Sequence, residues 1–147
     1  MARAPVTVIA GLAIAAVAGL SAQNNWGAWG QDPGGTKFST LAQINTSNVG
    51  RLKRAWTFHT GDNRGFFEST PIAVDGVLYF SAANGVYAVD GVTGQQIWKY
   101  ETTGTARRGP AYWPGGGGVG PRLFSSTANG VAALDVRTGA PIPGFGR

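Results

Sequence analysis

Short apolar runs alternate with turn-forming residues through the second half of the chain. One run covers 77–82 and another covers 123–127, and each is followed by an Asn-Gly pair and a second apolar run that ends in aspartate. Asn-Gly between two such runs is typical of a two-residue β-hairpin. The pattern therefore predicts a meander of antiparallel strands.

The whole pattern occurs twice. Residues 81–94 read Ser-Ala-Ala-Asn-Gly-Val-Tyr-Ala-Val-Asp-Gly-Val-Thr-Gly, and residues 126–139 repeat most of these positions. A period of about 40–45 residues built from short strands is typical of β-propellers. We therefore expect an all-β fold with one four-stranded blade over 71–100 and a second over 110–145.

Each repeat contains an Asp-x-x-Thr-Gly turn, which in the first repeat runs from Asp90 to Gly94. Aspartate at the start of a tight turn accepts hydrogen bonds from backbone N–H groups and from the threonine hydroxyl, while glycine supplies the positive φ. Trp98 follows in a strand expected over 95–100, where its flat face can cover a neighbouring blade and its N–H can reach a partner. Proline takes this position in the second repeat. The aspartates and threonines of both turns are predicted to be structural: Asp90, Thr93, Asp135 and Thr138.

Three segments precede the first blade. Residues 23–40 are rich in glycine and tryptophan and are expected to be extended and punctuated by turns. Thr46 or Ser47 is predicted to cap a short helix that ends at Leu52. Residues 55–58 alternate like a strand. We expect this leading strand to complete the last blade of a closed ring, where the two ends of the chain pair and remove the open edges.

The first 22 residues differ from the rest of the chain. Arg3 is a short basic region, 6–20 are apolar, and small residues follow at Ser21 and Ala22. About fifteen apolar residues are few for a bilayer span, which needs about 20. The segment 1–22 is therefore predicted to be a cleaved signal peptide, with an uncleaved membrane anchor as the alternative.

Composition narrows the possible functions. The chain has 147 residues, a formal net charge of +5 and no cysteine. The absence of cysteine excludes disulfides, thiolate metal sites and lipid attachment to an N-terminal cysteine. No basic stripe with interleaved aromatic residues is present, so nucleic-acid binding is not predicted. Propellers close with about four to eight blades, so residues 23–147 are expected to be the N-terminal, incomplete part of a longer one.

Two features that could suggest chemistry are better explained as loops. The glycine-rich stretch 115–120 has no Gly-Lys-Ser/Thr after it and no helical pattern, so a mobile hairpin loop is favoured over a phosphate-binding loop. His59 is the only histidine, and no carboxylate lies at metal-ligand spacing from it. We therefore expect a loop position for His59.

Three further stretches carry a resemblance to a known family. They are Trp-Gly-Gln-Asp-Pro-Gly-Gly-Thr-Lys-Phe-Ser at 29–39, continued by a related stretch at 44–56; Phe-Glu-Ser-Thr-Pro at 67–71; and Arg-Gly-x-x-Tyr-Trp-Pro at 108–114. In this order and spacing, residues 26–147 resemble the pyrroloquinoline quinone (PQQ) dependent dehydrogenases, which are periplasmic quinoproteins that oxidise alcohols and sugars. The resemblance implies an eight-bladed propeller.

The resemblance also implies a site. PQQ and Ca²⁺ would lie near the propeller axis, an alcohol or sugar would pass a hydride to the quinone, and a cytochrome c or a quinone would accept the electrons. Glu68 matches the family's cofactor-contacting glutamate, and Arg108 matches the arginine that pairs with the cofactor. The Ca²⁺ ligands and the catalytic aspartate are expected after Arg147.

The residues themselves agree with this placement. Glu68 and Arg108 each lie just before a proline that opens the first strand of a blade, at Pro71 and Pro110. The first strand of a blade is innermost, so both side chains are expected at the same end of the central channel. A planar guanidinium suits a tricarboxylate such as PQQ. The alternatives are a Glu68–Arg108 salt bridge or solvated loop charges, and Arg107 is a second candidate.

One departure bears on the substrate. Alcohol-oxidising members of the family carry adjacent cysteines a few residues before the Arg-Gly pair, and Thr-Ala-Arg occupies that region here, at 105–107. The glucose-dehydrogenase-like branch, which oxidises sugars or polyols, is therefore the closer resemblance. Two other functions stay open: a non-catalytic propeller of the outer-membrane assembly lipoprotein type, which the absence of cysteine disfavours, and a truncated, inactive gene product.

Overall fold

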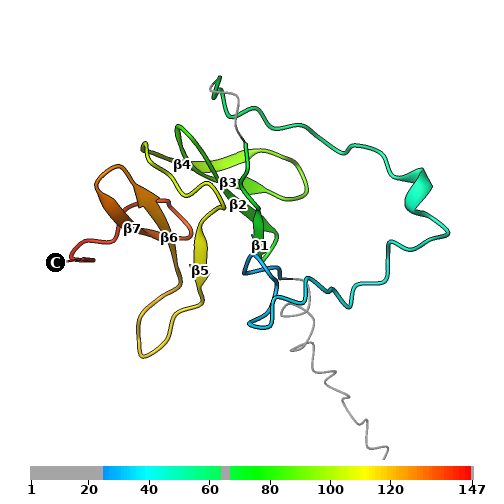
Figure 1. Ribbon diagram of the computed structural model, residues 1–147, viewed down its shortest axis with the longest axis horizontal. Coiled ribbons are helices and arrows are strands. Elements are labelled where there is room, and N and C mark those ends of the chain that lie inside the picture. Colours follow the sequence, from blue (N-terminus) through cyan, green and yellow to red (C-terminus); the bar gives the residue numbers. More distant parts are fainter. Residues whose placement is uncertain (1–24, 64–66, 147) are drawn as a thin grey trace, which may run out of the picture.

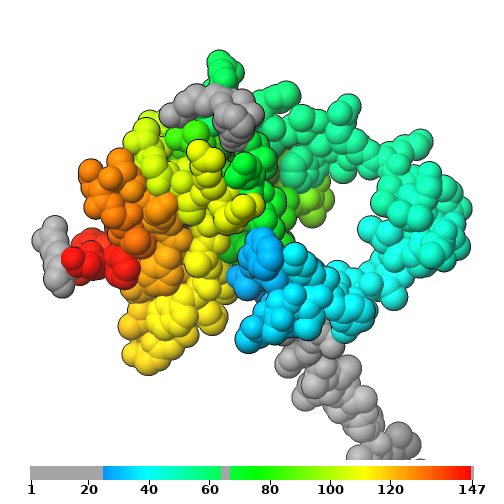
Figure 2. Space-filling model, in the orientation of Figure 1, coloured from blue at the N-terminus to red at the C-terminus, as the bar shows by residue number. Residues whose placement is uncertain are grey.

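The computed structural model describes residues 25–63 and 67–146, so the predicted signal peptide over 1–22 lies outside the described residues. Two antiparallel sheets lie side by side, and the chain over 36–54 loops away from them (Figure 1). Figure 2 shows open space between this arm and the sheets. No described helix is long and apolar enough to cross a bilayer.

The first sheet is the first predicted blade, and its four strands lie in chain order. They are β1 (Ile72–Val74), β2 (Val77–Ala82), β3 (Gly85–Asp90) and β4 (Gln96–Glu101). The prediction of a four-stranded meander is confirmed here, and the run 77–82 is itself strand β2.

The second blade has three strands in chain order, β5 (Ala111–Trp113), β6 (Arg122–Thr127) and β7 (Gly130–Asp135). The expected fourth strand is reduced to one isolated bridge between Leu134 and Pro141. Proline has no N–H to donate to a ladder, and Pro141 and Pro143 both fall in this stretch. The prediction of a fourth strand in the second blade was therefore wrong for the described residues.

Hairpin turns connect the strands, but not all lie where the sequence placed them. Register pairs Ala82 with Gly85, so the first repeat turns at Ala83–Asn84, one residue before the Asn-Gly pair. The turn between β1 and β2 is Asp75–Gly76, with φ of 49° and 81°. Positive φ at both central residues is typical of the type I′ hairpin turn.

The core lies on both faces of the first blade, because successive residues of a strand point to opposite sides. One cluster fills the space between the two blades: Ile72, Val74, Tyr79, Val86, Ala88, Trp98, Leu123 and Leu134. The other lies on the opposite face, where Phe80, Ala82, Tyr87 and Val89 pack against Trp56 and Phe58. The first blade is thus covered by the second blade on one face and partly covered by Trp56 and Phe58 on the other.

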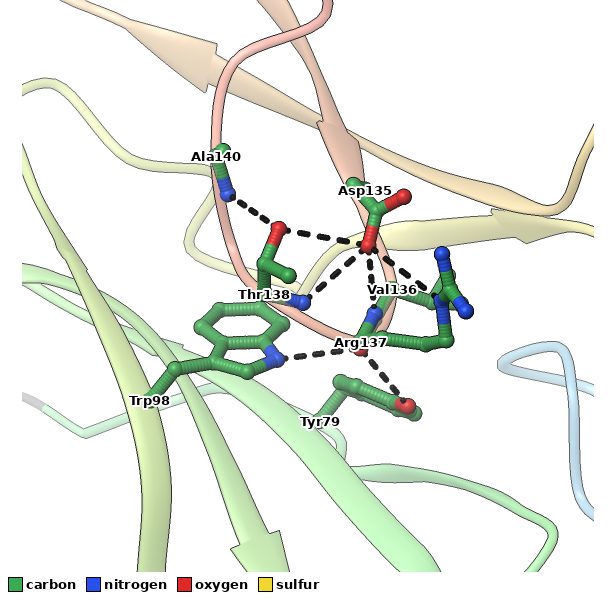
Figure 3. Close-up of polar contacts among 7 residues, drawn as sticks. All are labelled: Tyr79, Trp98, Asp135, Val136, Arg137, Thr138 and Ala140. Atoms are coloured by element: carbon green, nitrogen blue, oxygen red, sulfur yellow. Dashed lines mark hydrogen bonds and ion pairs between the residues drawn. The ribbon is translucent and has the colours of Figure 1, made fainter.

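Trp98 joins the first blade to the second (Figure 3). Its indole lies on Gly139, where an added Cβ would come within 2.6 Å of the ring. Its Nε1–H donates to the carbonyl of Val136 at 2.9 Å, and the Tyr79 hydroxyl donates to the same carbonyl at 3.2 Å. Burial raises the pKa of Tyr79 to about 12, so its hydroxyl stays a donor. The predicted inter-blade role of Trp98 is confirmed.

Trp56 makes the corresponding contact with the first blade. Its ring lies 2.5 Å from the place where a Cβ on Gly94 would be, and its Nε1–H donates to the carbonyl of Gly91 at 3.2 Å. Residues 55–58 therefore hold the position of an outer strand of a preceding blade. They form no backbone ladder with any described residue, so the predicted strand is extended but unpaired.

The Asp-x-x-Thr-Gly turns have the predicted structure. Asp90 Oδ1 accepts hydrogen bonds from the N–H of Val92 and of Thr93 and from the Thr93 hydroxyl, at 3.0, 2.7 and 2.9 Å. The Thr93 bonds lower the pKa of Asp90 below its ordinary value. Asp135 repeats the arrangement with Thr138 (Figure 3).

The arm before the first blade departs from prediction in one detail. Its helix is a single 3₁₀ turn at Val49–Arg51 whose N-cap is Asn48, not Thr46 or Ser47. Asn45 explains the difference, because its side-chain oxygen accepts hydrogen bonds from both the N–H and the hydroxyl of Ser47. The serine hydroxyl is therefore already used within a tighter turn.

Candidate functional site

The segments that lead into β1 and β5 meet at one end of the blades. Glu68 precedes β1 and Arg108 precedes β5, as the sequence predicted. The two segments touch through their backbones, since the N–H of Thr70 donates to the carbonyl of Arg108 at 3.3 Å. The structure thus brings both predicted site residues to the same end of adjacent innermost strands.

Gly109 makes this close approach possible. Its φ is +98°, and a Cβ there would lie 2.6 Å from the carbonyl oxygen of Thr70 and 3.1 Å from Ser69 Oγ. Any side chain would push the two lead-in segments apart. The glycine after Arg108 therefore has a structural reason, which is contact between adjacent blades.

Arg107 and Arg108 occupy the centre of one tight turn. The turn is closed by a hydrogen bond from the N–H of Gly109 to the carbonyl of Ala106, at 3.1 Å. Both arginines are exposed. Two permanent positive charges therefore lie at the tip of the loop between the blades.

Glu68 is also exposed, and its carboxylate does not pair with either arginine. Among the described residues, neither Glu68 nor Arg108 makes a side-chain hydrogen bond or an ion pair. The alternative of a Glu68–Arg108 salt bridge is thus not seen in this part of the chain. Guanidinium donors and a carboxylate acceptor at the same end of the blades suit a flat ligand that carries carboxylates on one edge and hydrogen-bond donors on another.

Metal chemistry has no complete set of ligands in this part of the chain. No group of three His, Cys, Asp or Glu side chains that could hold a metal ion gathers among residues 25–63 and 67–146. His59 is exposed and lines an apolar hollow of about 680 Å³ with Trp56, Phe67 and Phe80. This hollow is the open side of the first blade, on the face that Trp56 and Phe58 partly cover.

The glycine-rich stretch forms a hairpin loop, as predicted. Gly116 and Val119 exchange two backbone hydrogen bonds, at 2.9 and 3.0 Å. The Arg122 guanidinium lies 5.4 Å from the Trp113 ring centroid at the base of this loop. Nothing in the hairpin has the form of a phosphate cradle at a helix start.

Sequence reasoning missed two hydroxyl groups at this end. Ser69 Oγ accepts a hydrogen bond from the N–H of Ser81 at 3.0 Å, and Thr105 Oγ1 donates to the carbonyl of Ala82 at 2.8 Å. Both contacts join a loop residue to the end of β2. Their sequence separations, 12 and 23 residues, belong to no local motif, so only the position of Ser69 beside Glu68 hinted at a role.

Comparison with known proteins places this geometry in a family context. Residues 26–147 match the family model described as PQQ: Glucose/ethanol/alcohol dehydrogenase, beta-propeller domain. The quinate/shikimate dehydrogenase (quinone) of Acinetobacter baylyi is 38% identical in an alignment 132 positions long, which covers 81% of this chain and 16% of that protein. The dehydrogenase subunit of the alcohol dehydrogenase (quinone) of Gluconacetobacter polyoxogenes is 37% identical in an alignment 128 positions long, which covers 78% of this chain and 16% of that protein.

Comparison with solved structures identifies the same kind of protein. The quinohemoprotein alcohol dehydrogenase of Comamonas testosteroni superimposes with a TM-score of 0.68 and 30% identity, covering 83% of this chain and 21% of that one. A europium-containing methanol dehydrogenase gives a TM-score of 0.64 at 30% identity, covering 81% and 22%. The chain therefore spans about a fifth or less of the length of the relatives it matches.

Proposed function

The chain belongs to the family of PQQ-dependent glucose, ethanol and alcohol dehydrogenase β-propellers, and we propose that it contributes Glu68 and Arg108 to the cofactor site of a quinoprotein dehydrogenase. PQQ, when bound, supplies a quinone that accepts a hydride from the substrate. The residues of this chain bind and orient the cofactor. The working enzyme would be a complete polypeptide, meaning a chain long enough to close the propeller ring.

One observation carries the proposal. The hydrogen bond from Thr70 N–H to the Arg108 carbonyl holds the two lead-in segments together at one end of the blades. A cofactor at this end would meet a glutamate and an arginine from the segments that lead into β1 and β5. Arg108 would donate charge-assisted hydrogen bonds to an anionic edge, and Glu68 would accept hydrogen bonds from the cofactor side that carries donors.

Several further features of the enzyme are part of the same proposal. We infer a Ca²⁺ ion beside the cofactor, held by ligands from other parts of the complete polypeptide, and a cytochrome c or quinone as electron acceptor. The 1-butanol dehydrogenase (cytochrome c) of Thauera butanivorans, a relative 33% identical, carries such an acceptor in its name. Export through the segment 1–22 would place the enzyme in the periplasm.

The substrate is proposed to be an alcohol or a sugar. The residues at 105–107 contain no cysteine, which favours the sugar- or polyol-oxidising branch. The relatives bear names of both kinds, among them a glycerol dehydrogenase large subunit of Gluconobacter thailandicus, 34% identical. A panel of primary alcohols, polyols and aldoses assayed with a dye acceptor would separate the two branches.

Arg108→Ala in the complete polypeptide is expected to weaken PQQ binding while the fold stays intact. Loss of a charge-assisted hydrogen bond costs about 1.5–3 kcal/mol, which is roughly 10- to 150-fold in the dissociation constant. Arg108→Lys is expected to recover part of the affinity, since the ammonium keeps the charge but not the fork of donors. Titration of the apo-protein with PQQ measures the constants.

Arg107→Ala is the matched control, because Arg107 lies beside Arg108 in the same turn and is also exposed. Its loss is expected to change the affinity by less than about threefold, as for a solvated surface charge. Equal losses in both variants, or none in Arg108→Ala, would show that the cofactor-binding arginine was assigned to the wrong residue.

A further inference from the structure

The end of β2 projects beyond the start of β1. The ladder between these strands runs from Val74–Val77 to Ile72–Tyr79 and stops there. Ser81, two residues further along β2, lies beyond it, and its N–H is satisfied by the hydroxyl of Ser69 instead of by a backbone carbonyl. The side chain of Ser69 thus replaces one rung of the sheet.

Because the Ser69 side chain bonds to β2, the backbone of the next residue, Thr70, is available for a contact outside the sheet. Pro71 has no N–H, and the chain leaves the sheet at this residue. The N–H of Thr70 donates to the carbonyl of Arg108 across the blade boundary. Ser69 therefore ties the Glu68 segment to β2, while Thr70 ties the same segment to the arginine turn.

A second hydroxyl fixes the other loop to the same strand end. Thr105 Oγ1 donates to the carbonyl of Ala82 at 2.8 Å. On the far side, the Ser126 hydroxyl donates to the carbonyl of Gly104 at 2.8 Å, and the N–H of Ala128 donates to the carbonyl of Thr103 at 2.7 Å. The loop that carries the arginine turn is thus attached to both blades just before it reaches Arg108.

Ser81, the residue that Ser69 contacts, offers a control substitution for Ser69→Ala. Ser81 is 3% exposed, and its hydroxyl has no hydrogen-bond partner among the described residues. What Ser69 contacts is the backbone N–H of Ser81, which alanine would keep. Removing an unpartnered buried hydroxyl is close to neutral for stability. Ser81→Ala and Ser69→Ala therefore remove the same hydroxyl group from two residues that contact each other. Only the loss at Ser69 is expected to weaken cofactor binding.

From these contacts we propose that Ser69 and Thr105 are positioning residues, whose hydroxyl groups hold Glu68 and Arg108 in register at the end of β2 for binding of an anionic cofactor. This inference rests on the proposed function. In this proposal neither hydroxyl contacts the cofactor, because each is already bonded to the backbone of β2. Each acts through a charged side chain that lies one or three residues away.

The test is titration of the complete apo-protein with PQQ. Ser69→Ala and Thr105→Val are each expected to weaken binding by about 3- to 10-fold, the equivalent of one neutral hydrogen bond. Ser69→Thr and Thr105→Ser retain a hydroxyl and are expected to restore most of the affinity. Ser81→Ala is expected to stay within about twofold of the wild type, and urea unfolding midpoints check that all variants are folded.

A double-mutant cycle separates positioning from general damage. In an Arg108→Ala background, Thr105→Val is expected to cause little further loss of PQQ affinity, since the side chain it positions is gone. Fully additive losses, or unchanged affinity in both Ser69→Ala and Thr105→Val, would overturn this proposal alone. A wild-type protein that binds no PQQ would overturn the proposed function and this proposal with it.

Discussion

The two blades share a sequence pattern but differ in how much of it is buried. Val86 in the first repeat and Val131 in the second hold the same position, yet Val86 is 0% exposed and Val131 is 60% exposed. Val86 faces the second blade. Val131 lies on the far face of the second blade, where the described residues provide no further sheet. Burial in this molecule is therefore set by the neighbouring blade, and the repeat alone does not provide it.

The same difference separates the outer strands. The outer strand of the first blade, β4, carries Trp98, which covers Gly139 of the next blade and donates to the carbonyl of Val136. The second blade has Pro143 at the corresponding position, and the residues described up to 146 add no fourth strand to its ladder. Phe145 instead folds back so that its ring centroid is 5.3 Å from that of Phe124. In the second blade, the contact between Phe145 and Phe124 therefore stands where the first blade has the contact of Trp98 with its neighbour.

Trp98→Ala in the complete polypeptide should break the contact between the blades and give the largest effect. The ring is 7% exposed, and its truncation is expected to cost about 3–5 kcal/mol of unfolding free energy. Denaturant unfolding measures the shift of the midpoint. Trp29→Ala is the control, since Trp29 is 54% exposed and lies outside both blades. A normal midpoint with lost activity would place Trp98 in the active site instead.

Gly139→Ala attacks the same contact from the second blade. The substitution combines a φ of +71° with a Cβ 2.6 Å from the Trp98 ring, so strain and overpacking add to about 2–5 kcal/mol. Gly117→Ala isolates the backbone part, because Gly117 has a φ of +58° and open space around it. If the two variants lost equal stability, the tight packing of Trp98 on Gly139 would be refuted.

The smallest expected effect concerns acid. Hydrogen bonds from Thr93 lower the pKa of Asp90 below its ordinary value of 3.8, so the folded state holds the charged form more strongly. The resulting stabilisation is complete above the unfolded-state pKa and is lost as the pH falls through the folded-state pKa. The denaturant concentration at the unfolding midpoint is therefore expected to decrease once the pH drops below about 4. In Asp90→Asn the amide oxygen stays an acceptor, and this part of the decline should disappear.

Much of the fold could be predicted because its signals are local. The strand of residues 77–82, the Asp90 turn and the inter-blade contact of Trp98 each follow from a short pattern of residues. The short helix was misassigned at its cap because Asn45 competes for the Ser47 hydroxyl. The repeat predicted a fourth strand in the second blade, but Pro141 and Pro143 have no N–H to donate to a ladder there.

The site was harder to predict than the fold. Glu68 and Arg108 were placed at one end because each precedes a first strand, and the structure brings their segments together. Ser69 and Thr105 were missed because their partners, Ser81 and Ala82, lie in a strand distant in sequence. Contacts of this kind depend on where β1 stops pairing with β2, which no residue pattern specifies.

We propose that this chain is a sector of a propeller whose apolar faces need further blades, and unfolding of the isolated segment 23–147 tests this proposal most directly. Ordering the backbone costs about 1–2 kcal/mol per residue, which two blades with open faces do not offset. Urea unfolding followed by tryptophan fluorescence, together with light scattering, should show a broad, non-cooperative change and self-association through the open strand edges. A monodisperse monomer with one sharp transition would contradict the claim.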